Sequence, residues 1–159
     1  CGNHGTGHCS CSPFEIKRYT QRISGPIMDR IDIQKYMGKV DLFQTEQQPS
    51  GWSSKEMRER VARAREIQRR RFAAVPGIQA NGQMESMHIN EFCPLDRECT
   101  SLLKRSYEKF QFSARTHHKI IKIARTFADL DDSPEIRKPH MISGLMSRDL
   151  DKDKATMLV

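Results

Sequence analysis

The most regular pattern of apolar and polar positions lies in the segment SARTHHKIIKIARTFADL, which starts at Ser113. Its apolar residues recur every three or four positions, which is typical of a helix with one buried face, and Ser113 can cap that helix. The same spacing predicts further helices at about 55–72 after Ser53 or Ser54, after the sequence CPLD at 93–96, and from about Pro139. A weaker helix is expected over 84–92.

Each predicted helix has a stripe of residues that should face the core. The stripes are Met57, Val61, Ala64 and Ile67, then Leu103, Tyr107 and Phe110, then His117, Ile120, Ala124 and Phe127, and finally Met141 and Leu145. Strand-like alternation is almost absent from this part of the chain, so it predicts an all-α bundle of four to five helices.

The first 45 residues show a shorter and less regular pattern. The sequence SPFE at 12–15 is typical of a helix start, because serine can cap, proline suits the first helical position and glutamate completes a capping box. That helix should end near Ile23; PIMDRI then restarts a short helix, and 32–40 reads as extended. The polar stretch QTEQQPSG at 44–51 is a linker, so we expect two domains, 1–45 and 46–159.

Composition makes this a polar chain with room for only a thin core. It has 159 residues and a mean hydropathy of −0.70, and Leu, Ile, Val and Phe make up about a fifth of it. No apolar run approaches the roughly 20 residues that span a bilayer, and the N-terminal residues show no Met and no basic-then-apolar signal pattern. We therefore expect a cytoplasmic protein with no membrane association, cut from something longer.

A net charge of +7, from 27 basic and 20 acidic residues, favours an anionic partner such as nucleic acid or a nucleotide. Eight basic residues against three acidic ones lie between Lys55 and Arg71, and this helix could neutralise DNA phosphates, with Arg69, Arg70 and Arg71 as the candidates. The alternative is a solvated helix face with ion pairs one turn apart.

Five cysteines, an odd number, indicate reduced thiols or a metal site and not a secreted disulfide framework. Cys1, Cys9 and Cys11, with His4 and His8 between them, offer the thiolate and imidazole ligands that zinc prefers. The alternative is a loop of incidental thiols. Cys93 and Cys99 are expected to be small core residues.

Two arginines stand out by their context. Arg30 follows a short helix at its junction with an extended segment, a rigid corner from which a guanidinium can reach a phosphate on a neighbouring subunit. Arg115 lies in the first turn of the Ser113 helix, where a phosphate gains from both the charge and the helix end. For each, the alternative is an ordinary surface ion pair. The sequence contains no GxxxxGK[ST] loop, GxGxxG, HExxH or GxSxG, so it is not a complete P-loop NTPase.

Several blocks in this order resemble the C-terminal part of magnesium-chelatase-like AAA+ ATPases, and within that superfamily the ComM group. They are a Cys-Gly loop ending CxC, SPFEIKRYTQRISGP, IMDRID, SSKEMRERVARARE, CPLD, the SAR helix and ADL. The resemblance implies that 1–45 is the end of the nucleotide-binding core, a helix–strand remnant, and that 46–159 is the helical lid.

By the same resemblance Arg30 is the arginine finger, which acts in trans, and Arg115 is the sensor-2 arginine, which acts in cis. The implied assembly is a hexameric ring of identical subunits that hydrolyses ATP with Mg²⁺ and does mechanical work on DNA, while the fragment alone is inactive. The family's cysteine loop has a CxC pair at each end, and Cys1 would be the second member of the first pair. The alternative is a standalone basic helical module that binds nucleic acid, with a structural zinc loop.

Overall fold

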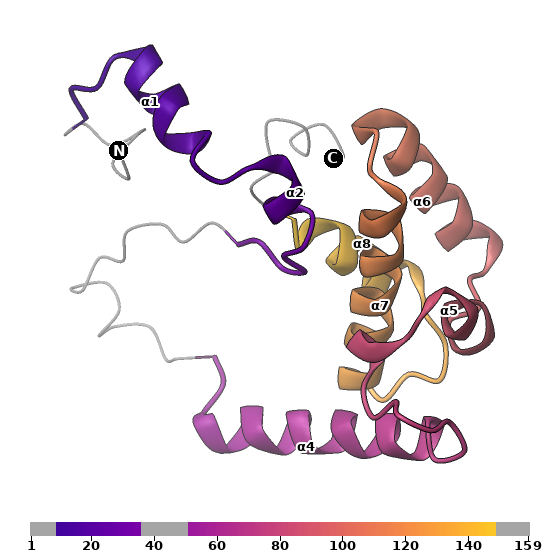
Figure 1. Cartoon of the computed structure of the whole chain (residues 1–159). Helices are drawn as coiled ribbons and strands as arrows, with labels where there is room; N and C mark the ends of the chain where they lie inside the picture. The colour runs from indigo at the N-terminus through magenta and orange to yellow at the C-terminus, as the bar shows by residue number, and fades with distance from the viewer. Residues whose placement is uncertain (1–8, 36–50, 149–159) are drawn as a thin grey trace. The chain divides into compact units, whose positions relative to one another are not determined.

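A computed structural model describes residues 9–35 and 51–148, and helices dominate this part of the chain. The elements are α1 (Pro13–Thr20), α2 (Gly25–Met28), α4 (Ser54–Arg71), the 3-10 turn η1 (Asn81–Gln83), α5 (Ser86–Phe92), α6 (Arg97–Phe110), α7 (Ala114–Leu130) and α8 (Lys138–Met146) (Figure 1). The mainly-α class is confirmed. A boundary between two compact units falls between Ile31 and Asp32. The linker at 44–50 and the extended stretch at 36–40 lie outside the described residues, so the domain boundary at 45/46 stays a prediction.

Serine caps start α1 and α4, as the sequence predicts. Ser12 Oγ accepts the Glu15 amide at 3.3 Å, and the Glu15 carboxylate accepts the Ser12 amide at 2.8 Å. Ser53 and Glu56 form the same reciprocal pair at 3.2 and 2.7 Å. These hydrogen bonds to the ionised form lower the pKa of both glutamates. Two capping boxes therefore fix where α1 and α4 begin.

Helix α1 ends at Thr20, which is earlier than the predicted Ile23. The Ser24 carbonyl already accepts the first amides of α2, from Ile27 and Met28, each at 3.0 Å. Ser24 therefore lies at the start of α2, and α1 ends a few residues before the sequence SGP at 24–26.

Helix α7 is the centre of the second unit, where it packs on α4, η1, α5 and α8 (Figure 1). Buried residues occur around most of its circumference, as expected of a helix with neighbours on several sides. They are Thr116, Ile120, Ile121, Ile123, Ala124, Arg125, Ala128 and Asp129. Helix α8 approaches α7 most closely at Gly144, where a Cβ atom would lie 2.9 Å from the Ile120 carbonyl oxygen.

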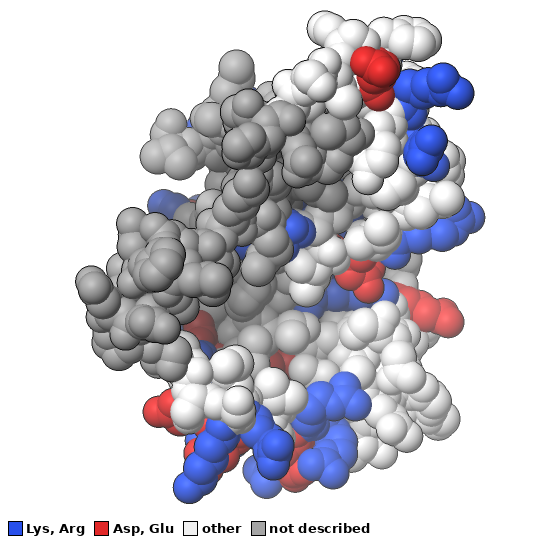
Figure 2. Space-filling view, turned by 90° about the vertical axis from the view of Figure 1, so that its left-hand side faces the viewer, with Lys and Arg blue, Asp and Glu red and all other residues white. Residues whose placement is uncertain are grey.

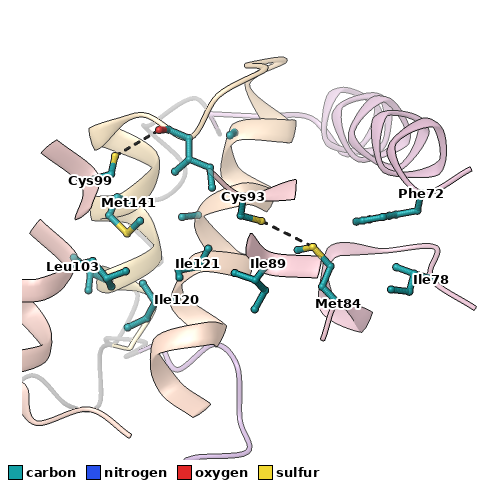
Figure 3. Close-up of a cluster of buried hydrophobic side chains, with 14 residues drawn as sticks. Phe72, Ile78, Met84, Ile89, Cys93, Cys99, Leu103, Ile120, Ile121 and Met141 are labelled. Atoms are coloured by element: carbon teal, nitrogen blue, oxygen red, sulfur yellow. Dashed lines mark hydrogen bonds between the residues drawn. The ribbon is translucent and has the colours of Figure 1, made fainter. Parts of the chain in front are cut away.

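One apolar cluster forms the core of this unit, and Figure 3 shows its side chains converging from α5, α6, α7, α8 and the loops. Cys93 and Cys99 lie inside it, with 4% and 0% of their surface exposed, which confirms them as small core residues. The Cys99 thiol donates to the Ile136 carbonyl at 3.5 Å, and the Cys93 sulfur lies 4.0 Å from that of Met84.

The predicted buried stripe of α4 is only partly right. Ala64 is buried, but Met57 and Val61 are 51% and 54% exposed. The C-terminal half of α4 instead turns polar side chains inward, including the buried Gln68 and the half-buried Arg71. Tyr107 on α6 is also exposed, whereas Leu103 and Phe110 are buried. Met141 and Leu145 on α8 are both buried, as predicted.

The inward polar groups meet at the carboxylate of Asp129, whose side chain is fully buried. Arg71 from α4 binds both of its oxygens, and Asn81 from η1 donates to Oδ2 at 2.7 Å. Arg125, one turn earlier on α7, donates to Oδ1 at 3.1 Å. The two terminal nitrogens of the Arg125 guanidinium donate to the carbonyls of residues 133 and 134. A single acid thus joins α4, η1, α7 and the loop that follows α7.

Replacing Asp129 should lower the free energy of unfolding of the second unit. Asp129→Ala leaves two guanidinium groups without their carboxylate, one of them buried, so we expect a loss of about 3–5 kcal/mol in the free energy of unfolding. Urea unfolding at pH 7 measures it. Glu98→Gln, which breaks the exposed pair between Glu98 and Lys138, is the control and should stay close to the wild type. An Asp129→Ala chain as stable as that control would contradict this role.

The close approach of α7 and α8 gives a second stability prediction. Gly144→Ala should cost about 1–3 kcal/mol, because the new methyl group would meet the Ile120 carbonyl and the Ala124 side chain. Gly82→Ala is the matched control, since no heavy atom lies within 4 Å of its added Cβ. Thermal unfolding of both variants separates the two cases, and equal midpoints would rule out tight packing at Gly144.

Candidate functional site

Arg30 lies in the turn that follows α2, within the first unit. The Arg30 amide donates to the Ile27 carbonyl at 2.9 Å, which extends the helical turn past Met28. Its side chain is exposed, and Nη1 donates to the Pro26 carbonyl at 3.0 Å. This hydrogen bond holds the guanidinium beside its own helix at the surface.

Arg115 lies in the first turn of α7 and is exposed. Ser113 caps this helix: its Oγ accepts the Thr116 amide at 3.2 Å, as the sequence predicts. Among the described residues no carboxylate pairs with the Arg115 guanidinium. A cation beside the amides of a helix start is suited to bind a phosphate.

The two arginines belong to different units, Arg30 to the first and Arg115 to the second. The roles predicted for them do not require contact within one chain, because a finger in trans and a sensor in cis serve two different ATP sites.

Helix α7 carries two further cations on the face of Arg115, because Lys119 and Lys122 follow it at helical spacing. Lys119 Nζ lies 2.6 Å from Asp32 Oδ1, and Lys122 Nζ donates to the Gly82 carbonyl at 3.2 Å. Burial lowers the pKa of Lys122. Sequence reasoning did not single out these lysines, although the four-residue spacing from Arg115 was a signal for Lys119.

A cavity of about 500 Å³ lies along this face of α7. Its walls are mainly apolar, with the two lysines and Asp32 at the polar positions. The lining residues are Asp32, Ile33, Gly82, Lys119, Lys122, Ile123, Thr126, Phe127 and Leu130. A second cavity of about 650 Å³ lies between α5, α6 and α7, beside Cys93, Tyr107 and His117. Burial, and to a lesser extent the neighbouring His118, lowers the pKa of His117.

The three arginines at the end of α4 do not share one environment. Arg69 and Arg70 are exposed and both pair with Glu66, at 2.9 and 3.0 Å. Arg71 points the other way, into the buried pair with Asp129. Figure 2 shows Lys and Arg side chains gathered along the lower edge of the molecule, over α4, with acidic side chains between them. Arg69 and Arg70 therefore remain candidates for phosphate contact, whereas the guanidinium of Arg71 is already bound by a carboxylate.

The cysteine loop is described only in part. Cys9 and Cys11 are half-exposed and reduced, while Cys1, His4 and His8 lie outside the described residues. Burial and the neighbouring Cys9 raise the pKa of the Cys11 thiol. Within 9–35 and 51–148 no three His, Cys, Asp or Glu side chains are grouped as metal ligands, so these residues do not support zinc. No helix among them is long and apolar enough to cross a membrane.

Comparison with protein families gives two adjoining matches. The family described as magnesium chelatase, subunit ChlI C-terminal, matches residues 51–148, and magnesium chelatase, subunit ChlI, matches residues 1–45. The two matches together cover both described parts of the chain.

The chain is 34% identical over 146 residues to competence protein ComM of Haemophilus influenzae, which is 89% of this chain and 27% of that protein. It is 30% identical over 153 residues to the uncharacterized protein YifB of Escherichia coli, covering 95% of the chain and 29% of that protein. YifB of Salmonella typhimurium is 28% identical over 152 residues, with the same coverage. The chain therefore spans less than a third of the length of these relatives.

Thiol reactivity should separate the exposed cysteine loop from the core cysteines. Burial raises the pKa of Cys93 to about 11 and that of Cys99 to about 12, so almost no reactive thiolate forms at either residue at pH 8. We expect iodoacetamide to label Cys9 in the native chain while Cys93 and Cys99 react only after unfolding in urea. Mass spectrometry of peptides identifies the labelled residues, and native labelling of Cys93 would contradict its place in the core.

Proposed function

Since the chain belongs to the magnesium chelatase ChlI family, we propose that it supplies two arginines to the ATP sites of an oligomeric AAA+ ATPase. Arg115 contacts the γ-phosphate bound by its own subunit, as the sensor-2 arginine. Arg30 reaches the γ-phosphate bound by the neighbouring subunit, as the arginine finger. The observation that carries this proposal is the exposed Arg115 guanidinium in the first turn of α7, with no carboxylate bound to it among the described residues.

The chemistry requires cations at these positions because negative charge spreads over the transferred phosphoryl group in the transition state. A guanidinium fixed beside that group stabilises the transition state more than the ground state. An arginine finger contributes about 10³–10⁵ in rate, or about 4–7 kcal/mol of barrier. The exposure of Arg30 at a helical turn fits a side chain that has to reach another subunit.

ATP hydrolysis also needs a phosphate cradle and ligands for Mg²⁺, and the 159 residues contain no GxxxxGK[ST] loop to form them. In this proposal those groups come from other residues of a longer ATPase, and the chain alone does not hydrolyse ATP. Identical subunits assemble into a hexameric ring, in which each subunit offers its Arg30 to the ATP site of a neighbour.

We propose DNA as the substrate on which this ATPase does its work, with α4 as a contact surface. A net charge of +7 and the exposed cations of α4 favour a polyanion. Arg69 and Arg70 would make these contacts, and Arg71 would support them indirectly by anchoring the end of α4 to Asp129.

Mixing subunits tests the two roles together. Arg30→Ala and Arg115→Ala in the full-length ATPase should each lower kcat by about 10³-fold or more. In rings assembled from equal amounts of both variants, about a quarter of the sites combine an intact Arg115 with a neighbour's intact Arg30. The ATPase rate of these rings should therefore be about a quarter of the wild-type rate. Steady-state ATP hydrolysis measures both effects.

Arg105→Ala serves as the control, because it removes an exposed arginine of α6, outside the proposed DNA surface, without touching either predicted phosphate contact. Full activity of both single variants would refute the proposal. Two inactive variants that do not complement each other would refute the division between trans and cis.

A further inference from the structure

The segment Asp32–Lys35 begins the second unit, directly after Arg30 and Ile31, and is bound to the helices of that unit at two points. Asp32 Oδ1 lies 2.6 Å from Lys119 Nζ on α7. Two residues on, the Gln34 amide donates to the Ser147 carbonyl at 2.7 Å, just past the end of α8. The segment therefore touches the two helices that form the closest pair in this unit.

The attachment at Gln34 is buried. Gln34 and Arg148, which pair as a parallel bridge, are each 3% exposed. The attachment at Asp32 is uneven: the Lys119 side chain is 15% exposed, whereas that of Asp32 is 65% exposed. Lys122, the next cation on this face, donates to the Gly82 carbonyl instead. Lys119 is therefore the lysine that holds Asp32.

The Asp32–Lys119 pair is informative because of where its two residues lie in the sequence. Asp32 comes two residues after Arg30, so their Cα atoms are at most about 7 Å apart. Lys119 comes one helical turn after Arg115, on the same face of α7. The pair thus joins the chain next to one predicted phosphate contact to the helix that carries the other.

From this placement we infer that Lys119 is a positioning residue, which couples the nucleotide contact of Arg115 to the placement of Arg30. The inference rests on the proposed roles of the two arginines. When α7 moves with the phosphate that Arg115 binds, Lys119 carries Asp32 with it, and Arg30 shifts relative to the neighbour's ATP. One subunit's nucleotide state would in this way set the rate at the next site around the ring.

The exposure of the Asp32–Lys119 pair argues against a purely structural role. One partner is mostly exposed, and ion pairs of that kind contribute little to the stability of a fold. The core and the Asp129 cluster hold the second unit together without it. Its removal should therefore change the position of the Asp32–Lys35 segment and leave the unfolding midpoint almost unchanged.

The first experiment measures the attachment itself, in the 159-residue chain and without ATP. Lys119→Gln should speed hydrogen exchange of the Gln34 amide by about 3- to 10-fold, because the segment opens more often. Lys119→Arg should restore the wild-type rate. Lys138→Gln is the matched control, since it breaks another exposed pair between elements, Lys138–Glu98 at 2.7 Å, and should leave this amide unaffected.

The second experiment measures the coupling, in the full-length ATPase. Lys119→Gln should lower kcat by about 10-fold with the KM for ATP unchanged, because Arg30 is misplaced while the nucleotide still binds. Lys119→Arg should restore kcat, and Lys138→Gln should match the wild type.

An exchange rate or a kcat in Lys119→Gln equal to the wild type would overturn the inference, as would an equal loss in Lys138→Gln. Failure of the proposed function has a different signature: Arg30→Ala and Arg115→Ala would both keep full ATPase activity, whatever Lys119→Gln does.

Discussion

The helical unit depends on the neutralisation of one carboxylate, that of Asp129. Burial of an ionised carboxylate destabilises a fold strongly unless opposite charges and hydrogen bonds surround it. Here two guanidinium groups and an amide do so. The partners come from α4, η1 and α7. Burial lowers the pKa of Arg125, and Asp129 opposes this effect, so each charge makes the burial of the other tolerable. In a chain with a thin apolar core, this cluster decides how α4 crosses α7.

The cluster also explains why an arginine-rich helix has two kinds of arginine. Arg71 points into the interior, whereas Arg69 and Arg70, two residues and one residue earlier, face solvent beside Glu66. In the N-terminal half of α4 only Arg60 is partly buried. It stacks on Trp52 at 4.1 Å and pairs with Asp131. Basic composition alone therefore overstates the surface of α4 that a polyanion could use.

The helices could be predicted well from the sequence, because each start depends on a capping residue and its near neighbours. Ser12, Ser53 and Ser113 cap their helices through the expected side-chain hydrogen bonds, which involve only the next three residues. Sequence reasoning missed the polar interior, since Asp129 and Arg125 look like a solvated i,i+4 pair until α4 is placed over them. It could not foresee the end of α6 either, where Gln111 adopts a left-handed conformation with φ 48° without a glycine. For the candidate site, it found both arginines from context but not Lys119, whose partner lies 87 positions earlier in the chain.

The distance in sequence between Asp32 and Lys119 bears on how such a chain could work. Arginines that serve two different ATP sites have no chemical reason to move together, and a flexible connection between them would make each site independent. Between Arg30 and α4 the chain passes through the polar stretch 44–51, which the sequence predicts to be a linker. The Asp32–Lys119 pair and the Gln34–Ser147 hydrogen bond bypass that linker, because they attach the residues just after Arg30 to α7 and α8 directly. In the proposed coupling, a displacement at the first turn of α7 would pass along this helix, which Asp129 anchors near its C-terminal end, and not through a loop.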